Sequence, residues 1–166
     1  MKDYEIFYQQ LTTPFRSRPR IVKGMAYFNR GMTVFMPLVY GLVLIDAFLM
    51  EGWKGLLAFF LLPAIGFGLL SVIRKWLNQA RPYEKWAIQP LLAKDTSGKS
   101  MPSRHVFSAT VISMCLLYFF WLPGLLCLLL SAGLALVRVI GGVHYPKDVV
   151  IGYLCGICWG ALIFLL

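Results

Sequence analysis

Five long apolar segments constrain the fold of this chain more than any other feature. Of its 166 residues, 59% are hydrophobic and 14% are charged, against about 25% charged residues in a typical water-soluble domain. A hydrocarbon core about 30 Å thick is crossed by roughly 20 apolar residues in a helix. The segments near this length are 32–50, 55–73, 106–122, 123–137 and 149–166. The sequence therefore predicts a multi-pass membrane protein.

The predicted fold is an all-α membrane bundle of about five transmembrane helices, formed by residues 31–166. Backbone polar groups in lipid must be paired within the spanning structure, which excludes open sheets. Leu122, Pro123 and Gly124 separate the third segment from the fourth. Because proline and glycine favour turns, we expect a tight helical hairpin with its turn at these residues.

Residues 1–30 are predicted to form a basic amphipathic segment at the membrane interface. The apolar side chains Tyr4, Phe7, Tyr8 and Leu11 recur at helical spacing, as in an interfacial helix. Basic residues follow at 16, 18, 20, 23 and 30. They can recruit anionic lipid or simply set the topology. The net charge of +9 is interpreted as affinity for membrane and phosphate, since no nucleic-acid-binding module is visible.

Polar residues gather in three regions: the first 30 residues, the connection 74–104, and the stretch 138–148. Counting the predicted spans places all three on one side of the membrane, where they can share a site. The chain has two histidines, His105 and His144, and each lies in one of these regions. A neutral imidazole can attack phosphorus and an imidazolium can protonate a leaving oxygen, so this pairing indicates phosphoryl transfer.

Arg74 and Arg81 occupy the start of the long connection. A helix that ends at Arg81, before Pro82, places both guanidinium groups on one face, about 10 Å apart along its axis. Guanidinium groups suit phosphate oxygens. The alternative is a positively charged cap at a helix end and membrane interface.

Ser103, Arg104 and His105 directly precede the third segment. Ser103 is predicted to be the N-cap of that helix, and a helix N-terminus binds anions. The hydroxyl of Ser103 and the amide and side chain of Arg104 can then hold phosphate oxygens while His105 faces the ester oxygen. The alternative is a structural cap beside an interfacial histidine.

Arg138, His144 and Asp148 form the third group. An arginine at mid-bilayer costs about 2.5 to 3.5 kcal/mol, so Arg138 should have a partner. Gly141 and Gly142 allow a bend before His144. Asp148, one helical turn further, can hold one ring N–H and leave the other nitrogen free to attack. The alternative is a purely structural His–Asp pair.

These three groups together resemble the signature of the type 2 phosphatidic acid phosphatase superfamily, which are integral membrane lipid phosphatases. That signature runs K-x-x-x-x-x-x-R-P, then P-S-G-H, then S-R-x-x-x-x-x-H-x-x-x-D. Here it corresponds to Arg74 with Arg81-Pro82, to residues 102–105, and to Arg138 with His144 and Asp148. The resemblance covers roughly residues 55–166.

The resemblance implies that His144 is the nucleophile, Asp148 orients it, and His105 is the general acid. It also implies a phosphate-binding group, with Lys75 and Gly142 as accessory residues. That group comprises Arg74, Arg81, Ser103, Arg104 and Arg138. No metal or other cofactor is expected, and the four cysteines lie in apolar segments, which favours neither disulfides nor a zinc site.

The resemblance suggests undecaprenyl diphosphate, phosphatidylglycerol phosphate or phosphatidic acid as the substrate, in a cell membrane. Two alternatives are a lipid phosphotransferase that uses the same histidine and a silent lipid-binding protein. The basic N-terminus favours a cytoplasmic active face, whereas many bacterial relatives act on the outer face. We follow the relatives and expect an extracytoplasmic site.

The chain departs from the family signature at three positions. Arg74 replaces lysine, Arg104 replaces glycine, and Val137 stands where a serine usually precedes the arginine. Arg104 adds a cation that favours a diphosphate or another highly charged head group, and Val137 removes a hydroxyl. Both histidines and Asp148 are retained, so we expect an active enzyme.

Overall fold

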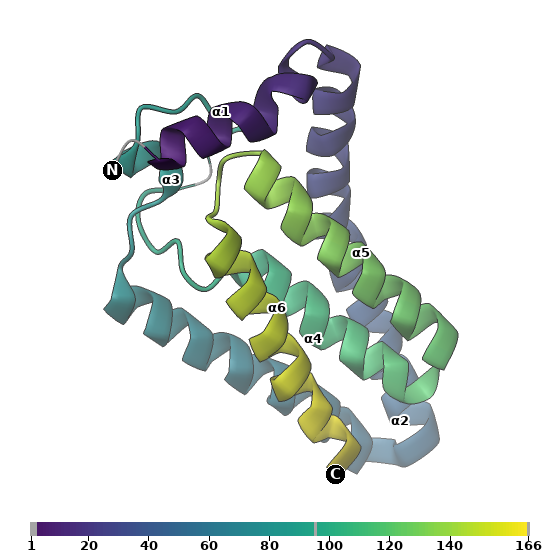
Figure 1. Ribbon diagram of the computed structural model, residues 1–166. Helices are drawn as coiled ribbons and strands as arrows, with labels where there is room; N and C mark the ends of the chain where they lie inside the picture. The colour runs from purple at the N-terminus through teal and green to yellow at the C-terminus, as the bar shows by residue number, and fades with distance from the viewer. Residues whose placement is uncertain (1–2, 95, 166) are drawn as a thin grey trace.

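The computed structural model describes residues 3–94 and 96–165, and these residues contain helices and connections but no strand. The helices are α1 (Asp3–Arg16), α2 (Pro19–Leu77), α3 (Pro82–Lys85), α4 (Arg104–Phe119), α5 (Trp121–Ile140), α6 (Pro146–Ala161) and the short 3-10 helix η1 (Leu162–Leu165). Figure 1 shows α4, α5 and α6 side by side, with α1 across one end of them.

Helix α2 consists of two arms that meet at Gly52. The Gly52 φ of 68° and ψ of −153° interrupt the helix, and a positive φ is accessible to glycine without steric cost. In Figure 1 the two arms form a V around the other helices. Segments 19–85, 121–140 and 146–165 are long and apolar enough to span a membrane. With α2 divided and α4 added, the bundle has about five apolar helical segments among the described residues, which confirms the predicted fold class.

Helix α4 is the centre of the bundle. Its 16 residues extend about 24 Å, less than a hydrocarbon core, but α2, α5 and α6 all contact it. Its buried side chains extend from Val106 to Leu116. Because α4 is enclosed by protein, its polar N-terminus can lie at the edge of the bundle and still be covered by other helices.

The predicted hairpin between α4 and α5 is present, but its turn lies earlier than expected. Phe120, with a φ of −135° and a ψ of 94°, separates the two helices. Pro123 and Gly124 therefore lie in the first turn of α5. Proline is tolerated there because the first turn of a helix has no intrahelical partner for its amide. A Cβ at Gly124 would collide with the backbone of Leu117, so glycine is needed where the two helices approach.

Three glycines at a spacing of four residues bring α6 against α4. A Cβ at Gly152 would lie 2.8 Å from the carbonyl oxygen of Ser103, and one at Gly156 would lie 2.7 Å from the Cβ of Thr110. Gly160 similarly faces Met114. Small residues at this spacing allow membrane helices to approach closely. This contact holds the N-terminal end of α6 beside the N-terminal end of α4.

The N-terminal helix α1 covers the polar end of the bundle. Tyr8 is fully buried, and its hydroxyl donates a 3.1 Å hydrogen bond to the carbonyl of Ile140. The Tyr4 ring lies 4.9 Å from that of Tyr145. Residues 19–30 continue directly into the first arm of α2 and do not form a separate basic tail. The interfacial position of segment 1–30 stays a prediction.

Replacing Gly156 with valine should destabilise the bundle, because the new side chain must displace Thr110 and separate α6 from α4. Overpacking of this kind costs about 1–3 kcal/mol. Gly68→Val is the matched control, because a Cβ at Gly68 has no atom within 4 Å. We expect a lower thermal midpoint in detergent for Gly156→Val than for Gly68→Val. Equal midpoints would show that the glycine contact contributes no stability.

Candidate active site

His144 lies in the connection between α5 and α6, and the start of α6 fixes its partner. Tyr145 is the N-cap of α6 and Pro146 follows it as the first helical residue. The Asp148 carboxylate accepts a 3.1 Å hydrogen bond from the Tyr145 amide. The Nδ1 of His144 lies 3.6 Å from the Oδ2 of Asp148. The predicted pair is therefore formed, and Nε2 is the ring nitrogen on the opposite side from the carboxylate.

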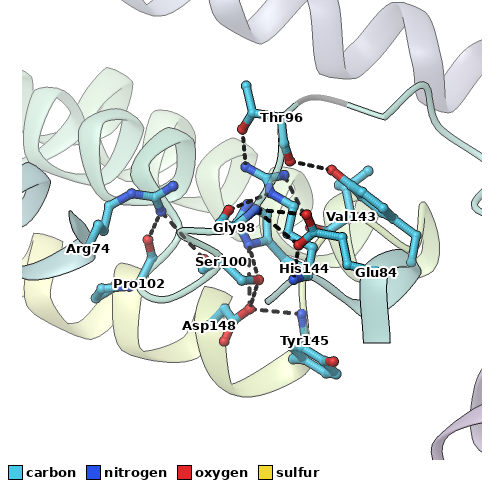
Figure 2. Close-up of polar contacts among 12 residues, drawn as sticks. Arg74, Glu84, Thr96, Gly98, Ser100, Pro102, Val143, His144, Tyr145 and Asp148 are labelled. Carbon is cyan, nitrogen blue, oxygen red and sulfur yellow. Dashed lines mark hydrogen bonds and ion pairs between the residues drawn. The ribbon is translucent and has the colours of Figure 1, made fainter. Parts of the chain in front are cut away.

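Ser100 also contacts this pair, a contact that no sequence motif predicted. Its hydroxyl donates a short hydrogen bond to Oδ2 of Asp148 and lies 3.4 Å from Nδ1 of His144. Figure 2 shows Ser100, His144 and Asp148 converging. All three side chains are buried. Ser100 lies two residues before Pro102 and outside the recognised motif, so only the folded connection reveals it.

The surroundings of His144 favour its neutral form. Burial is the main cause that lowers the pKa of His144 below its usual 6.5, because a buried cation loses hydration. The Asp148 carboxylate opposes this shift, while the nearby cations Arg138 and Arg81 lower the pKa further. A neutral imidazole at pH 7 retains the lone pair that a nucleophile needs.

Arg138 has the partner that its position required. Its guanidinium is 1% exposed and donates a 3.0 Å hydrogen bond from Nη1 to the Oδ1 of Asn29. Asn29 lies in the first arm of α2, in the segment that the sequence assigned to an interfacial tail. The carbonyl of Arg138 also accepts the His144 amide at 3.3 Å. Arg138 thus links the first arm of α2 to the histidine loop.

Arg74 and Arg81 are both buried at this end of the bundle, but not through the predicted helix. Helix α2 ends at Leu77, because Asn78 adopts the left-handed conformation of a C-cap. Arg81 instead precedes α3 in extended backbone. The prediction of one helix through Arg81 was therefore wrong, and Arg81 is buried from the extended backbone that precedes α3.

The two guanidinium groups bind different residues of the connection 96–102, and Figure 2 shows Arg74 beside Pro102. Arg81 donates from Nε to the Gly98 carbonyl at 3.2 Å and from Nη2 to the Thr96 hydroxyl at 3.1 Å. Arg74 donates from Nη1 to the carbonyls of Ser100, at 3.4 Å, and Pro102. These bonds hold both cations, and the loop itself, next to His144.

Ser103 is the N-cap of α4, as predicted, but its hydroxyl makes no capping bond. The amide of Ser103 donates to the carbonyl of Asp148 at 2.9 Å, which joins the second motif to the third. Its buried Oγ has no hydrogen-bond partner among the described residues. A buried hydroxyl without a partner is costly, and a bound phosphoryl oxygen would provide one.

His105 and Arg104 face a cleft beside α4. Both residues line this cleft, whose volume is about 230 Å³. His105 is partly buried and Arg104 is exposed. The structure therefore places His105 in the wall of a cleft between α4 and the arms of α2.

The remaining predicted residues have different surroundings. Lys75 is exposed and takes no part in the contacts described above. Gly142 has a φ of 75°, and a Cβ there would collide with the Tyr8 hydroxyl, so a glycine is required. Among the described residues, no group of three His, Cys, Asp or Glu side chains could hold a metal ion.

The chain matches known proteins in both sequence and structure. The PAP2 superfamily model matches residues 54–166. The crystal structure of LpxE from Aquifex aeolicus has a TM-score of 0.75 and 21% identity over 96% of this chain and 93% of that one. A transmembrane PAP2 type phosphatidylglycerolphosphate phosphatase from Bacillus subtilis has a TM-score of 0.62 and 21% identity, over 99% and 95% of the two chains. No curated protein matches.

The family match contains all three groups of site residues, from Arg74 to Asp148. The solved structures, at their low identity, agree in fold. The chain therefore belongs to the PAP2 superfamily and is a membrane phosphatase that acts on lipid phosphates.

Proposed function

We propose that this protein hydrolyses the terminal phosphate of a lipid phosphate or diphosphate through a phospho-His144 intermediate. The observation that carries the proposal is the buried pair of His144 and Asp148, surrounded by buried arginines. Arg74, Arg81 and Arg138 supply three positive charges and Asp148 one negative charge, a balance of +2 among the buried charged groups that the structure describes. A phosphate dianion neutralises that balance.

In the first step, Nε2 of His144 attacks the terminal phosphorus and the bond to the leaving oxygen breaks. Asp148 holds the opposite side of the ring and stabilises the positive charge that develops on it. Arg74, Arg81 and Arg138, with the Ser103 hydroxyl, bind the phosphoryl oxygens and stabilise the transition state, while the exposed Arg104 is available to the rest of the lipid head group. His105 donates a proton to the leaving oxygen, and the dephosphorylated lipid departs.

In the second step, water attacks the phosphorus of phospho-His144. His105, now neutral, accepts a proton from this water and so returns to its starting form. The N–P bond breaks, inorganic phosphate leaves, and His144 regains its neutral ring. An alcohol in place of water would make the same site a phosphotransferase.

The candidate substrates are undecaprenyl diphosphate, phosphatidylglycerol phosphate and phosphatidic acid, in a cell membrane. The Bacillus subtilis structure that this chain resembles is described as a phosphatidylglycerolphosphate phosphatase, which supports a lipid of this kind. We place the active face on the extracytoplasmic side. Lys147 is exposed, so a Lys147→Cys variant tests that placement in intact cells. A thiol reagent that does not cross the membrane should label the new cysteine if the active face is extracytoplasmic.

His144→Ala should abolish phosphate release from these lipids in detergent. Removal of the nucleophile should lower kcat by at least about 10³-fold and eliminate acid-labile labelling by lipid that carries ³²P in its terminal phosphate. His105→Ala is the informative comparison, because loss of a general acid costs about 10²–10⁴-fold but leaves the nucleophile in place.

The assay contains EDTA, because we expect no metal requirement. His105→Ala should still be labelled by a phosphate ester with a good leaving group. Full activity in His144→Ala would refute the mechanism, and a phosphorylated alcohol without free phosphate would identify a transferase. No release from any lipid by folded protein would refute the phosphatase.

The pH dependence should reflect the lowered pKa of His144. Because the neutral ring is the active form, kcat/KM should decline with falling pH only below pH 6.5, the usual pKa of histidine. Asp148 raises this pKa, so Asp148→Asn should move the acid limb to still lower pH while it reduces kcat. The measurement is kcat/KM from pH 4 to 8 for both proteins. A shift of the acid limb to higher pH in Asp148→Asn would contradict its assignment to His144.

Ser100→Ala should reduce kcat by about tenfold with little change in KM, since a hydrogen bond to a charged group contributes about 1.5–3 kcal/mol. The buried hydroxyl positions Asp148 and His144 without contacting substrate. Ser97→Ala is the control, because Ser97 is exposed in the same connection. Equal steady-state kinetics for the two variants would show that Ser100 has no positioning role.

A further inference from the structure

The cleft beside His105 lies between the two arms of α2. Its apolar walls include Met32, Met36 and Pro37 from the first arm, Phe67 from the second arm, and Ile112 from α4. Asn29, Arg104 and His105 also line it. The cleft is therefore an apolar space between membrane-crossing segments, and it borders the polar site because Asn29 also binds Arg138.

A second cavity, of about 340 Å³, extends this space. It shares Pro37, Phe67, Ser108 and Ile112 with the cleft and continues to Tyr40 and Phe60. The two cavities thus adjoin each other along α4, and together they are called the passage below. Because its walls are almost entirely apolar, the passage fits the hydrocarbon chain of a lipid whose phosphate lies at the His105 end.

Arg104 lies where this passage meets the polar site. Its guanidinium carbon is 5.3 Å from the centre of the Phe67 ring, so the side chain extends toward the second arm of α2. Within residues 3–94 and 96–165, no side chain forms an ion pair or hydrogen bond with this guanidinium. Arg74 and Arg81, by contrast, already donate to protein oxygens.

Burial also distinguishes Arg104 from the other site arginines. Arg74, Arg81 and Arg138 are buried, while Arg104 is exposed. A guanidinium at a membrane interface binds phosphate oxygens in paired hydrogen bonds. Arg104 can therefore accept a second anionic group between the reacting phosphate and the hydrocarbon chain.

We propose that Arg104 and the cleft form a second anion subsite, which makes this enzyme selective for lipids that carry two phosphorus groups. The inference rests on the proposed function and specifies its substrate class. The second group is either the inner phosphate of a diphosphate or a phosphodiester. Both present the same chemistry, a phosphorus atom with two bridging oxygens and anionic non-bridging oxygens.

With a diphosphate, the subsite takes part in the reaction itself. The terminal phosphorus forms a bond to Nε2 of His144, and its bond to the bridging oxygen breaks. That oxygen leaves with the inner phosphate, which becomes a lipid monophosphate and takes its proton from His105. Arg104 stabilises the negative charge that develops on this leaving phosphate.

With a phosphodiester such as that of phosphatidylglycerol phosphate, Arg104 contributes binding instead, because a glycerol unit separates the two phosphorus atoms. Phosphatidic acid and polyprenyl monophosphates present no second phosphorus group. Arg104 should therefore raise kcat/KM for two-phosphorus lipids above that for one-phosphorus lipids with the same hydrocarbon chain.

The test compares two pairs of lipids with matched chains: farnesyl diphosphate with farnesyl monophosphate, and phosphatidylglycerol phosphate with phosphatidic acid. The measured quantity is the ratio of kcat/KM within each pair. Arg104→Gln should lower at least one ratio by about tenfold, the effect of one charged hydrogen bond of about 1.5 kcal/mol. Arg30→Gln is the control, since Arg30 is exposed on α2 and does not line the cleft.

A loss confined to the farnesyl pair identifies a diphosphate, and a loss confined to the diacyl pair identifies a phosphodiester. Unchanged ratios in Arg104→Gln, or an equal loss in Arg30→Gln, would overturn the proposal.

A binding measurement tests the second anion subsite independently of phosphatase activity. In His144→Ala protein, the increase in thermal midpoint on adding each lipid reports affinity without turnover. If the unaltered protein releases no phosphate, the phosphatase fails, yet an Arg104-dependent preference for two-phosphorus lipids would still support the subsite. The absence of that preference would reject it.

Discussion

The carboxylate of Asp148 is the interaction on which the rest of the site depends. It is the one buried carboxylate among the described residues, next to three buried arginines and His144. Its Oδ2 accepts from the Tyr145 amide and the Ser100 hydroxyl, and its main-chain carbonyl accepts from Ser103. One residue therefore caps α6, orients the histidine and attaches α4. Burying a charge is costly unless such partners surround it, so the three motifs assemble together.

This charge cluster lies at one end of the bundle, and the bend of α2 at Gly52 lies at the other. Gly52 joins the two arms of α2 far from the site in sequence, and Figure 1 shows the arms diverging from that bend. Between them, α4 is enclosed along most of its length, while the glycines of α6 keep its N-terminus beside that of α4. The divergence leaves the apolar cleft that begins at His105. A break in one helix thus creates an apolar cleft beside the polar end of the bundle.

Sequence spacing predicted the parts of the site that lie within single helical turns. The four-residue interval from His144 to Asp148 and the N-cap position of Ser103 follow from local helix geometry, and the structure has both. The end of α2 was misplaced because the left-handed Asn78 terminates the helix before Pro82 can act. The roles of Ser100 and Asn29 could not be predicted, because their partners Asp148 and Arg138 are distant along the chain and no local sequence pattern encodes such contacts.

The contacts of Arg74 explain why an arginine suits the position where the family signature has a lysine. A lysine presents a compact point charge, whereas a guanidinium presents a planar set of donors. Here Arg74 donates to the carbonyls of both Ser100 and Pro102, on either side of Met101. It therefore fixes the same segment whose Ser100 hydroxyl binds Asp148 and whose Ser103 begins α4. Arg74 therefore supports this loop, and through the loop a single cation connects α2 to both histidine-bearing motifs.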